Sequence, residues 1–419
     1  MKKKILIITY DFVPYISPNT YRWQNVLDYW QKEYNCEIHV VTPSRNFESE
    51  YEVIDDIHIH RTPMSASLKV KNQNSTNSVT DIKKTKLKLL HFINKYILSK
   101  LYWPDFAFLW FFSGRHLAQK IIDKYKISNV ISVSWPFTDH LIAYSLRMKN
   151  DFNWIADTID PFCYSKAVNN YKIYGLLNRY IERKVFKKAN SISVLTSNVK
   201  NKYIKCFDDF DSKIVINPNI YVPVPLVVEN TIKYNFKFVF IGTLNLNVRR
   251  PDLALSFFSR LNKKYPDNNF EFHFYGNMIS CQNIFEEYTE LKNKLFLHGL
   301  VSKKVAMEEI FNADVLINIG NNNPYQEPSK LLDYIQSKHK IINICSINND
   351  SSLNILQQYP LNFNVFRDDI DKDYIYDKLI EFIRNENIVD DNALQNCIIE
   401  ILEQYNIKNV STRYYNMLK

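Results

Sequence analysis

The chain has 419 residues, of which 46% are hydrophobic and 23% charged, so it is long enough for two or three domains with buried cores and is not disordered. Its six scattered cysteines form no CxxC pair, which argues against both a disulfide scaffold and a zinc site. The net charge of +9 is uneven: residues 1–222 carry 32 Lys and Arg against 20 Asp and Glu, while the remainder carries 21 against 24. A basic first half favours an anionic partner, either a nucleic acid or a membrane surface.

The first residues, MKKKILIITY, predict a strand, because their apolar run of five is too short for a signal peptide. No run of about 20 apolar residues occurs anywhere in the sequence. We therefore expect a cytoplasmic protein, with any membrane contact peripheral.

Strand and helix patterns alternate through the first half. A strand at 4–10 is followed by a helix from Thr20 to Tyr34, capped by Asn19 and Thr20, and by a strand at 37–43. Further helices are expected at 113–126, 137–149 and 170–189, and further strands at 129–134, 153–157 and 191–196. This alternation predicts a doubly wound α/β domain.

A second series of strands follows a proline-rich linker at 217–230. These strands are expected at 237–242, 270–276, 294–299 and 314–320. Each ends at a glycine, and the chain has only six glycines, so the four together favour a ligand crevice over ordinary turns. We predict an N-terminal domain of residues 1–222, a C-terminal domain of residues 223–399, and a last helix at 400–419 that returns to the first domain.

The segment 82–104 carries six lysines and no acid, interleaved with leucine, isoleucine and aromatic residues. An interfacial helix on a membrane has this composition, and so does a core-packed helix with a solvated lysine face. Nucleic-acid binding is not expected, because no recognised module appears. His58 and His60 have the spacing of some metal ligands, but with no third ligand in view we interpret them as a pair on a strand surface.

The segment 238–345 resembles the donor half of glycosyltransferase family 4. The resemblance lies in FVFIGTLNLNVRRPDLAL, FHFYGN, LFLHGLVSKKVAMEEIFNADVLINIG and EPSKLLDYIQSKHKIINI. The first half is similar too, in PNTYRW at 18–23 and in the tract that ends WIADTIDPF. The resemblance implies the GT-B architecture of two Rossmann-like domains and the retaining transfer of a sugar from a nucleotide-diphosphate sugar. It also implies a glycan or lipid-linked acceptor, a role in bacterial capsule, O-antigen or exopolysaccharide synthesis, and no essential metal or other cofactor.

A departing diphosphate needs positive charge and backbone amides. The resemblance implies that Arg249, Arg250 and Lys330 supply the charge. Pro328 suits the first position of the helix that would present the amides. Asp333 stands where the family holds the ribose, although it can equally pair with Lys330 one helical turn away.

One departure from the family pattern concerns the sugar. Tyr325 stands where the family's first acid is expected, and Glu327 is the nearest acid. On the acceptor side the resemblance implies Arg22, Asp157 and Asp160, the last of these as a catalytic residue. The residues implied at the donor are Gly242, Thr243, Tyr325, Glu327, Pro328, Ser329, Leu331 and Asp333.

Two alternatives remain open. A non-catalytic GT-B homologue that binds glycan or scaffolds a partner would explain the missing first acid. A nucleotide-sugar epimerase would use the same donor without an acceptor.

Overall fold

The structure, a computed structural model, describes residues 2–15, 17–45, 48–63, 102–164, 174–207, 210–223, 236–386 and 388–419. Most of the lysine-rich segment, residues 82–101, and part of the expected linker, residues 224–230, lie outside the described residues. The chain divides into two compact units, which we call unit 1 (residues 1–220 and 407–419) and unit 2 (residues 221–406).

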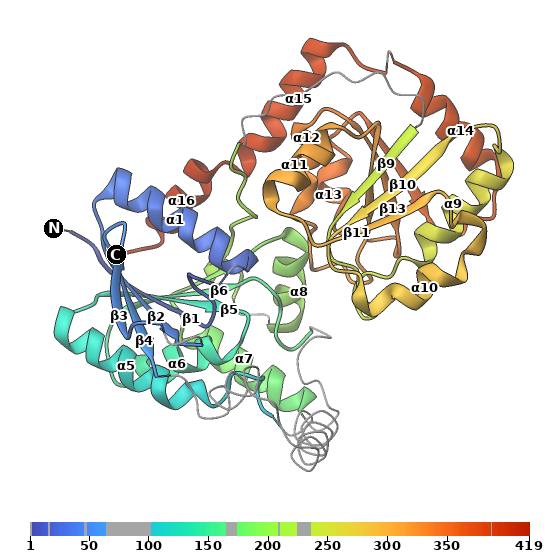
Figure 1. Cartoon of the computed structure of the whole chain (residues 1–419). Helices are drawn as coiled ribbons and strands as arrows, with labels where there is room; N and C mark the ends of the chain where they lie inside the picture. Colours follow the sequence, from blue (N-terminus) through green and yellow to red (C-terminus); the bar gives the residue numbers. More distant parts are fainter. Residues whose placement is uncertain are drawn as a thin grey trace. The chain divides into compact units, whose positions relative to one another are not determined.

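The described part of unit 1 is built on an eight-stranded sheet in the order β3-β4-β2-β1-β5-β6-β7-β8, in which β3 and β4 are antiparallel and all other neighbours are parallel (Figure 1). The strands are β1 (Lys4–Thr9), β2 (Glu37–Pro43), β3 (Tyr51–Ile54), β4 (Ile57–Thr62), β5 (Asn129–Ser134), β6 (Asn153–Thr158), β7 (Ser191–Val194) and β8 (Ile214–Ile216). The helices are α1 (Pro18–Tyr34), α5 (Trp110–Tyr125), α6 (Thr138–Arg147), α7 (Gly175–Lys188), α8 (Ser197–Phe207), η2 (Asp211–Lys213) and α16 (Ile407–Asn416).

Helix α1 begins earlier than expected. Ser17 is its N-cap, and the Ser17 hydroxyl accepts the Thr20 N–H at 3.1 Å. Pro18 follows at the first helical position, where the missing N–H costs no hydrogen bond. The expectation that Asn19 and Thr20 cap the helix is therefore wrong, because both residues lie inside it.

Unit 2 is built on a parallel sheet that, in the described residues, has six strands in the order β11-β10-β9-β12-β13-β14. The strands are β9 (Phe236–Ile241), β10 (Phe270–Tyr275), β11 (Leu295–Gly299), β12 (Val315–Ile319), β13 (Lys340–Cys345) and β14 (Asn362–Phe366). The helices are α9 (Asp252–Lys264), η3 (Ile279–Cys281), α10 (Gln282–Glu287), η4 (Thr289–Leu291), α11 (Lys303–Phe311), α12 (Lys330–Gln336), α13 (Leu353–Leu356), η5 (Arg367–Asp369), α14 (Asp373–Arg384) and α15 (Asp391–Gln404).

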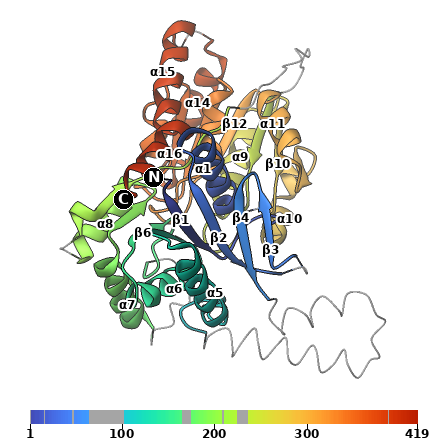
Figure 2. The ribbon, with the colours of Figure 1, turned by 90° about the vertical axis from the view of Figure 1, so that its left-hand side faces the viewer.

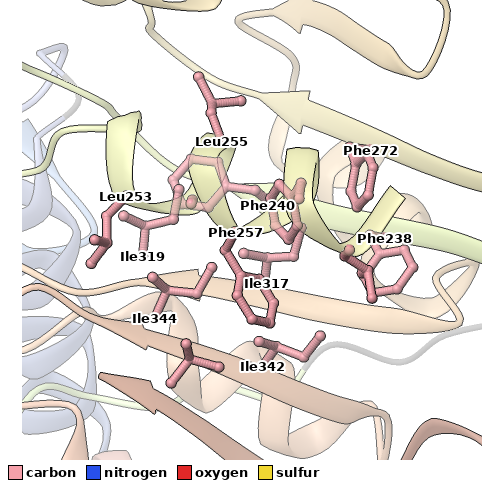
Figure 3. Close-up of a cluster of buried hydrophobic side chains, with 14 of the residues drawn as sticks. Phe238, Phe240, Leu253, Leu255, Phe257, Phe272, Ile317, Ile319, Ile342 and Ile344 are labelled. Carbon is pink, nitrogen blue, oxygen red and sulfur yellow. The ribbon is translucent and has the colours of Figure 1, made fainter. Parts of the chain in front are cut away.

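The core of unit 2 is rich in aromatic residues. Phe238 and Phe240 on β9 pack with Phe257 on α9 and with isoleucines of β12 and β13 (Figure 3). Fully burying one such side chain contributes roughly 1.5–3 kcal/mol. Strands buried on both faces read as continuous apolar runs, which is why the sequence predicts them well.

Each sheet contains a point where the strand order reverses. In unit 1 the strands that follow β1 in sequence, β2 to β4, lie on one side of it, and the strands from β5 onward lie on the other side. The reversal therefore lies between the neighbours β1 and β5. In unit 2 it lies between β9 and β12. Open α/β sheets bind ligands outside the carboxyl ends of the strands at such a point. The doubly wound α/β prediction is confirmed for both halves.

The last part of the chain forms two helices instead of the single expected helix at 400–419. Helix α15 ends at Gln404, and the Tyr221 N–H then donates to the Tyr405 carbonyl at 2.7 Å. Asn406 forms an isolated bridge with Tyr221, and this pairing interrupts the helix. Helix α16 alone returns to unit 1, where it lies beside α1 (Figures 1 and 2).

The histidine pair of β4 is not on the surface as expected, because His60 is buried. Its Nε2 lies 3.0 Å from Nδ1 of His39, a third histidine that the sequence analysis missed. Burial lowers the pKa of His60 to about 4, so the ring is neutral. The described residues contain no group of three or more His, Cys, Asp or Glu that could hold a metal ion.

No helix in the described part of the chain has both the length and the apolar character needed to cross a membrane.

Candidate nucleotide-sugar site

Arg249 lies at the reversal point of unit 2. It ends a tight turn after β9, in which Asn245 and Arg249 exchange backbone hydrogen bonds of 2.9 and 3.2 Å. Its side chain lies against Gly242, where an added Cβ would come within 3.2 Å of Nη1. Burial lowers the pKa of Arg249 from its ordinary value, although the residue stays charged at neutral pH.

Asn321 connects the two strands that flank the reversal point. It follows β12, and its Oδ1 accepts the Nε–H of Arg249 at 3.0 Å. Its Nδ2 donates to the Gln326 carbonyl at 2.7 Å. One buried amide side chain therefore holds the arginine after β9 and the loop before α12.

That loop, residues 323–329, carries four of the eight sequence-predicted donor residues. The amides of Tyr325 and Gln326 donate to Asn323 Oδ1 at 3.1 and 3.2 Å, which closes a turn. Ser351, after β13, donates its hydroxyl to the Gln326 carbonyl at 2.6 Å. The loop is thus fixed from two neighbouring strand ends just before Glu327.

Glu327 is half-buried, and no hydrogen bond or ion pair joins it to another described residue. Burial raises the pKa of its carboxyl group to about 8, and the group acts electrostatically on Tyr405. A carboxylic acid that is neutral at pH 7 can donate a hydrogen bond, for example to a hydroxyl group of a ligand.

Lys330 is the first residue of α12, and its Nζ lies 3.1 Å from Oδ2 of Asp333. Lys330 and Asp333 therefore form the ion pair across one helical turn that the sequence analysis considered as an alternative to ribose binding. Pro328 is not at the first helical position as expected, because Ser329 is the N-cap and Pro328 precedes it. The Pro328 carbonyl accepts the Leu331 N–H at 3.2 Å, so that amide is engaged within the turn.

Helix α12 is held against β9 by Tyr334, whose phenol oxygen accepts the Ile241 N–H at 2.8 Å. Leu331 is fully buried in the core, whereas Ser329 and Thr243 are exposed. The helix is thus anchored at the strand end that precedes Gly242.

Arg250 is placed differently from Arg249, although the two are adjacent in sequence. Its side chain is half exposed, and its Nε lies 2.7 Å from Oδ1 of Asp252 at the start of α9. Of the two arginines, Arg249 is the one that is hydrogen-bonded to Asn321.

Asp350 is a buried acid that the sequence analysis missed. Ser352 donates both its N–H and its hydroxyl to Oδ1, at 2.9 and 2.7 Å. Oδ2 has no hydrogen-bond partner among the described residues and lies 1.9 Å from where a Cβ of Gly320 would be. Burial raises the pKa of Asp350, and the nearby charge of Arg249 lowers it.

Close packing explains why two of the four strand-end positions are glycine. Gly320 leaves room for Asp350, and Gly276 has a φ of +123° and would place a Cβ 1.9 Å from the Gly242 carbonyl. Close packing within unit 2 therefore accounts for these two.

On unit 1, Arg22 and Asp157 belong to one buried group. Arg22 donates to the carbonyls of Pro218 and Asn217, at 2.6 and 2.8 Å, and to the hydroxyl of Tyr414 at 2.6 Å. Asp157 accepts the same Tyr414 hydroxyl and, at 2.9 Å, the Nε1–H of Trp23. The group fastens α16 to α1 and β6.

Asp160 is half-buried, in the loop after β6. Both oxygens of the buried Glu182 accept backbone N–H groups of this loop, from Phe162 and Cys163, at 3.0 Å each. Glu182, on α7, also accepts the Tyr203 hydroxyl at 2.6 Å. The loop that carries Asp160 is therefore held from α7.

The sequence analysis missed Asn321, Asp350 and Ser351. The run of three asparagines after the strand that ends at Gly320 was a usable signal for the first. The other two follow β13, and only the fold brings them to Gln326 and Gly320.

No family model matches this chain, and no curated protein matches its sequence. Solved structures do match over its full length. The E. coli trehalose-6-phosphate structure bound with UDP-2-fluoro glucose has a TM-score of 0.67 at 10% identity, and covers 99% of this chain and 98% of its own. The GT-B fold is now established.

The apo lipopolysaccharide outer core galactosyltransferase WaaB has a TM-score of 0.64 at 14% identity, with 99% of this chain and 98% of its own covered. Anabaena HepE in complex with UDP and glucose has a TM-score of 0.61 at 8% identity, with the same two coverages. At these identities the likeness shows the GT-B fold alone.

Proposed function

We propose that this chain is a retaining glycosyltransferase that moves a sugar from a nucleotide-diphosphate sugar to a lipid-linked or glycan acceptor in bacterial surface-polysaccharide synthesis. The hydrogen bond from Arg249 to Asn321 carries the proposal, because it places a cation at the reversal point of the unit 2 sheet. The loop held by Asn321 leads directly to Lys330. Two similar structures support the donor class, because one is bound with UDP-2-fluoro glucose and the other is a complex with UDP and glucose.

In this proposal Arg249 and Lys330, with Arg250, stabilise the negative charge that develops on the leaving diphosphate. Lys330 exchanges part of its contact with Asp333 for the phosphate, which leaves Asp333 available to the ribose hydroxyls. Gly242, Thr243 and the Ser329 backbone complete the surroundings of the diphosphate. No side chain attacks the sugar, and no metal takes part.

Glu327 takes the place of the family's first acid in this proposal and donates a hydrogen bond to a sugar hydroxyl. Its raised pKa supports the role, because a neutral acid does not repel the diphosphate. Tyr325, one residue before Gln326, flanks the sugar.

On unit 1 we assign Asp160 to the acceptor, with Arg22 and Asp157 as positioning residues that fix the end of β6. The segment 82–104 would make peripheral contact with the membrane that carries a lipid-linked acceptor.

The experiment is the release of nucleotide diphosphate from a panel of UDP-, GDP-, ADP- and TDP-sugars, and of CMP from its sugar conjugate, with and without acceptor lipid extracts. Lys330→Ala and Asp333→Ala should each lower the rate with the accepted donor. Unchanged release in both variants would overturn the site assignment.

A further inference from the structure

Helix α7 is divided lengthwise into a buried half and an exposed half. Asn178, Glu182, Val185 and Phe186 are buried. Successive helical residues are about 100° apart, so the remaining positions spread over about 180° of the opposite side. Apart from Gly175, the exposed residues are Leu176, Leu177, Arg179, Tyr180, Arg183, Lys184, Lys187 and Lys188.

The exposed half of α7 is basic and contains no acid. The one acid of the helix, Glu182, is buried and already accepts the amides of Phe162 and Cys163. The exposed half therefore carries five Lys and Arg side chains and no acid. A face of this charge complements an anionic surface.

The same face is apolar at its N-terminal end. Leu176 is 83% exposed, Tyr180 58% and Leu177 40%. A helix that only had to remain solvated would gain nothing from these side chains, whereas they gain free energy on entering a lipid interface. A nucleic-acid site needs the cations but not the leucines, which favours a membrane over a nucleic acid.

We propose that the exposed half of α7 docks on the surface of an anionic lipid bilayer. Leu176 and Tyr180 enter the headgroup region, and Arg183, Lys184, Lys187 and Lys188 lie against the lipid phosphates. This surface is separate from the segment 82–104. The inference does not rest on the proposed reaction, because its test needs neither donor nor acceptor.

The test is co-sedimentation of the full chain with phosphatidylglycerol–phosphatidylcholine vesicles and with pure phosphatidylcholine vesicles. The wild type should bind only the anionic vesicles, and more weakly at high salt. Each cation near an anionic surface changes binding roughly fivefold, so the variant with Arg183, Lys184, Lys187 and Lys188 all changed to Gln should bind roughly 600-fold more weakly. Leu176→Ser with Tyr180→Ser should also weaken binding.

A matched control changes four exposed lysines of unit 2 to Gln: Lys263, Lys292, Lys303 and Lys304. It removes the same net charge and should keep most of the binding. Equal losses in the control and the α7 variant would overturn the proposal, as would a wild type that ignores anionic vesicles but binds a labelled single-stranded RNA through α7. Circular dichroism and thermal unfolding show that each variant is folded.

Discussion

At the scale of single residues, Arg249 and Arg250 are adjacent in the sequence but have different hydrogen-bond partners. The two arginines look equivalent in NVRRPD, yet one bonds Asn321 and the other pairs with Asp252. The partner of Arg249 is Asn321, which lies 72 positions away, so a local sequence pattern could not have predicted this contact.

We predict that Arg249→Ala weakens nucleotide-diphosphate binding roughly 10- to 100-fold, because a charge-assisted hydrogen bond contributes about 1.5–3 kcal/mol. Isothermal calorimetry with the accepted nucleotide measures the effect. Arg260→Ala is the control, since Arg260 pairs with Asp371 on the surface and should leave affinity unchanged. Equal affinities of wild type and Arg249→Ala would remove Arg249 from the site.

Glu327 gives a prediction about pH and stability. Its carboxyl pKa is about 8 in the folded chain and lies near 4.5 in the unfolded chain, so between these values the folded state binds more protons. Stability contributed by this group therefore falls as pH rises from 4.5 to 8. Glu327→Gln should stabilise the chain by up to about 4 kcal/mol at pH 8.5 and have little effect at pH 4.5. Thermal unfolding at the two pH values measures this, and a gain of the same size at both would contradict the raised pKa.

At the scale of elements, the strands of both sheets were predictable because buried parallel strands are continuous apolar runs. The ends of the helices were harder to predict from the sequence. Ser17 rather than Asn19 caps α1, and Tyr405 and Asn406 interrupt the last helix because they pair with Tyr221. Caps and breaks depend on single hydrogen bonds, some to distant residues.

The loop before α12 provides the prediction at this scale. Asn321→Ala removes the acceptor of Arg249 and the donor to Gln326, so we expect a loss of about 1–3 kcal/mol of stability and weaker nucleotide binding. Asn322→Ala is not a neutral control, because Asn322 holds the neighbouring turn. Asn354→Ala on α13 is suitable, and comparison of unfolding temperatures with calorimetry separates the two effects. Unchanged nucleotide affinity in Asn321→Ala would show that the loop does not contact the ligand.

At the scale of the whole molecule, the last residues belong to unit 1 because Tyr414 joins two buried charges. Its hydroxyl accepts from Arg22 and donates to Asp157. The motif residues of PNTYRW and WIADTIDPF were recognisable in the sequence, but their common partner near the C-terminus was not. Part of what looked like acceptor chemistry is therefore, in the structure, the attachment of α16.

We predict that Tyr414→Phe destabilises unit 1 by about 2–3 kcal/mol, since it leaves buried charged groups short of a partner. Tyr415→Phe is the matched control, because the Tyr415 ring stacks on Tyr34 without a hydrogen bond from its hydroxyl within the described residues. Nucleotide affinity, which we propose to depend on unit 2, should be the same in both variants. Equal stability of the two variants in urea unfolding would contradict this account.

The central claim is that unit 2 holds a nucleotide diphosphate at the reversal point of its sheet. The most direct measurement is the thermal shift of the full chain with UDP, GDP, ADP, TDP and CMP, repeated with Lys330→Ala. We predict that at least one nucleoside diphosphate raises the unfolding temperature of the wild type, and that the rise is much smaller in Lys330→Ala. No rise with any nucleotide, or an equal rise in both proteins, would contradict it.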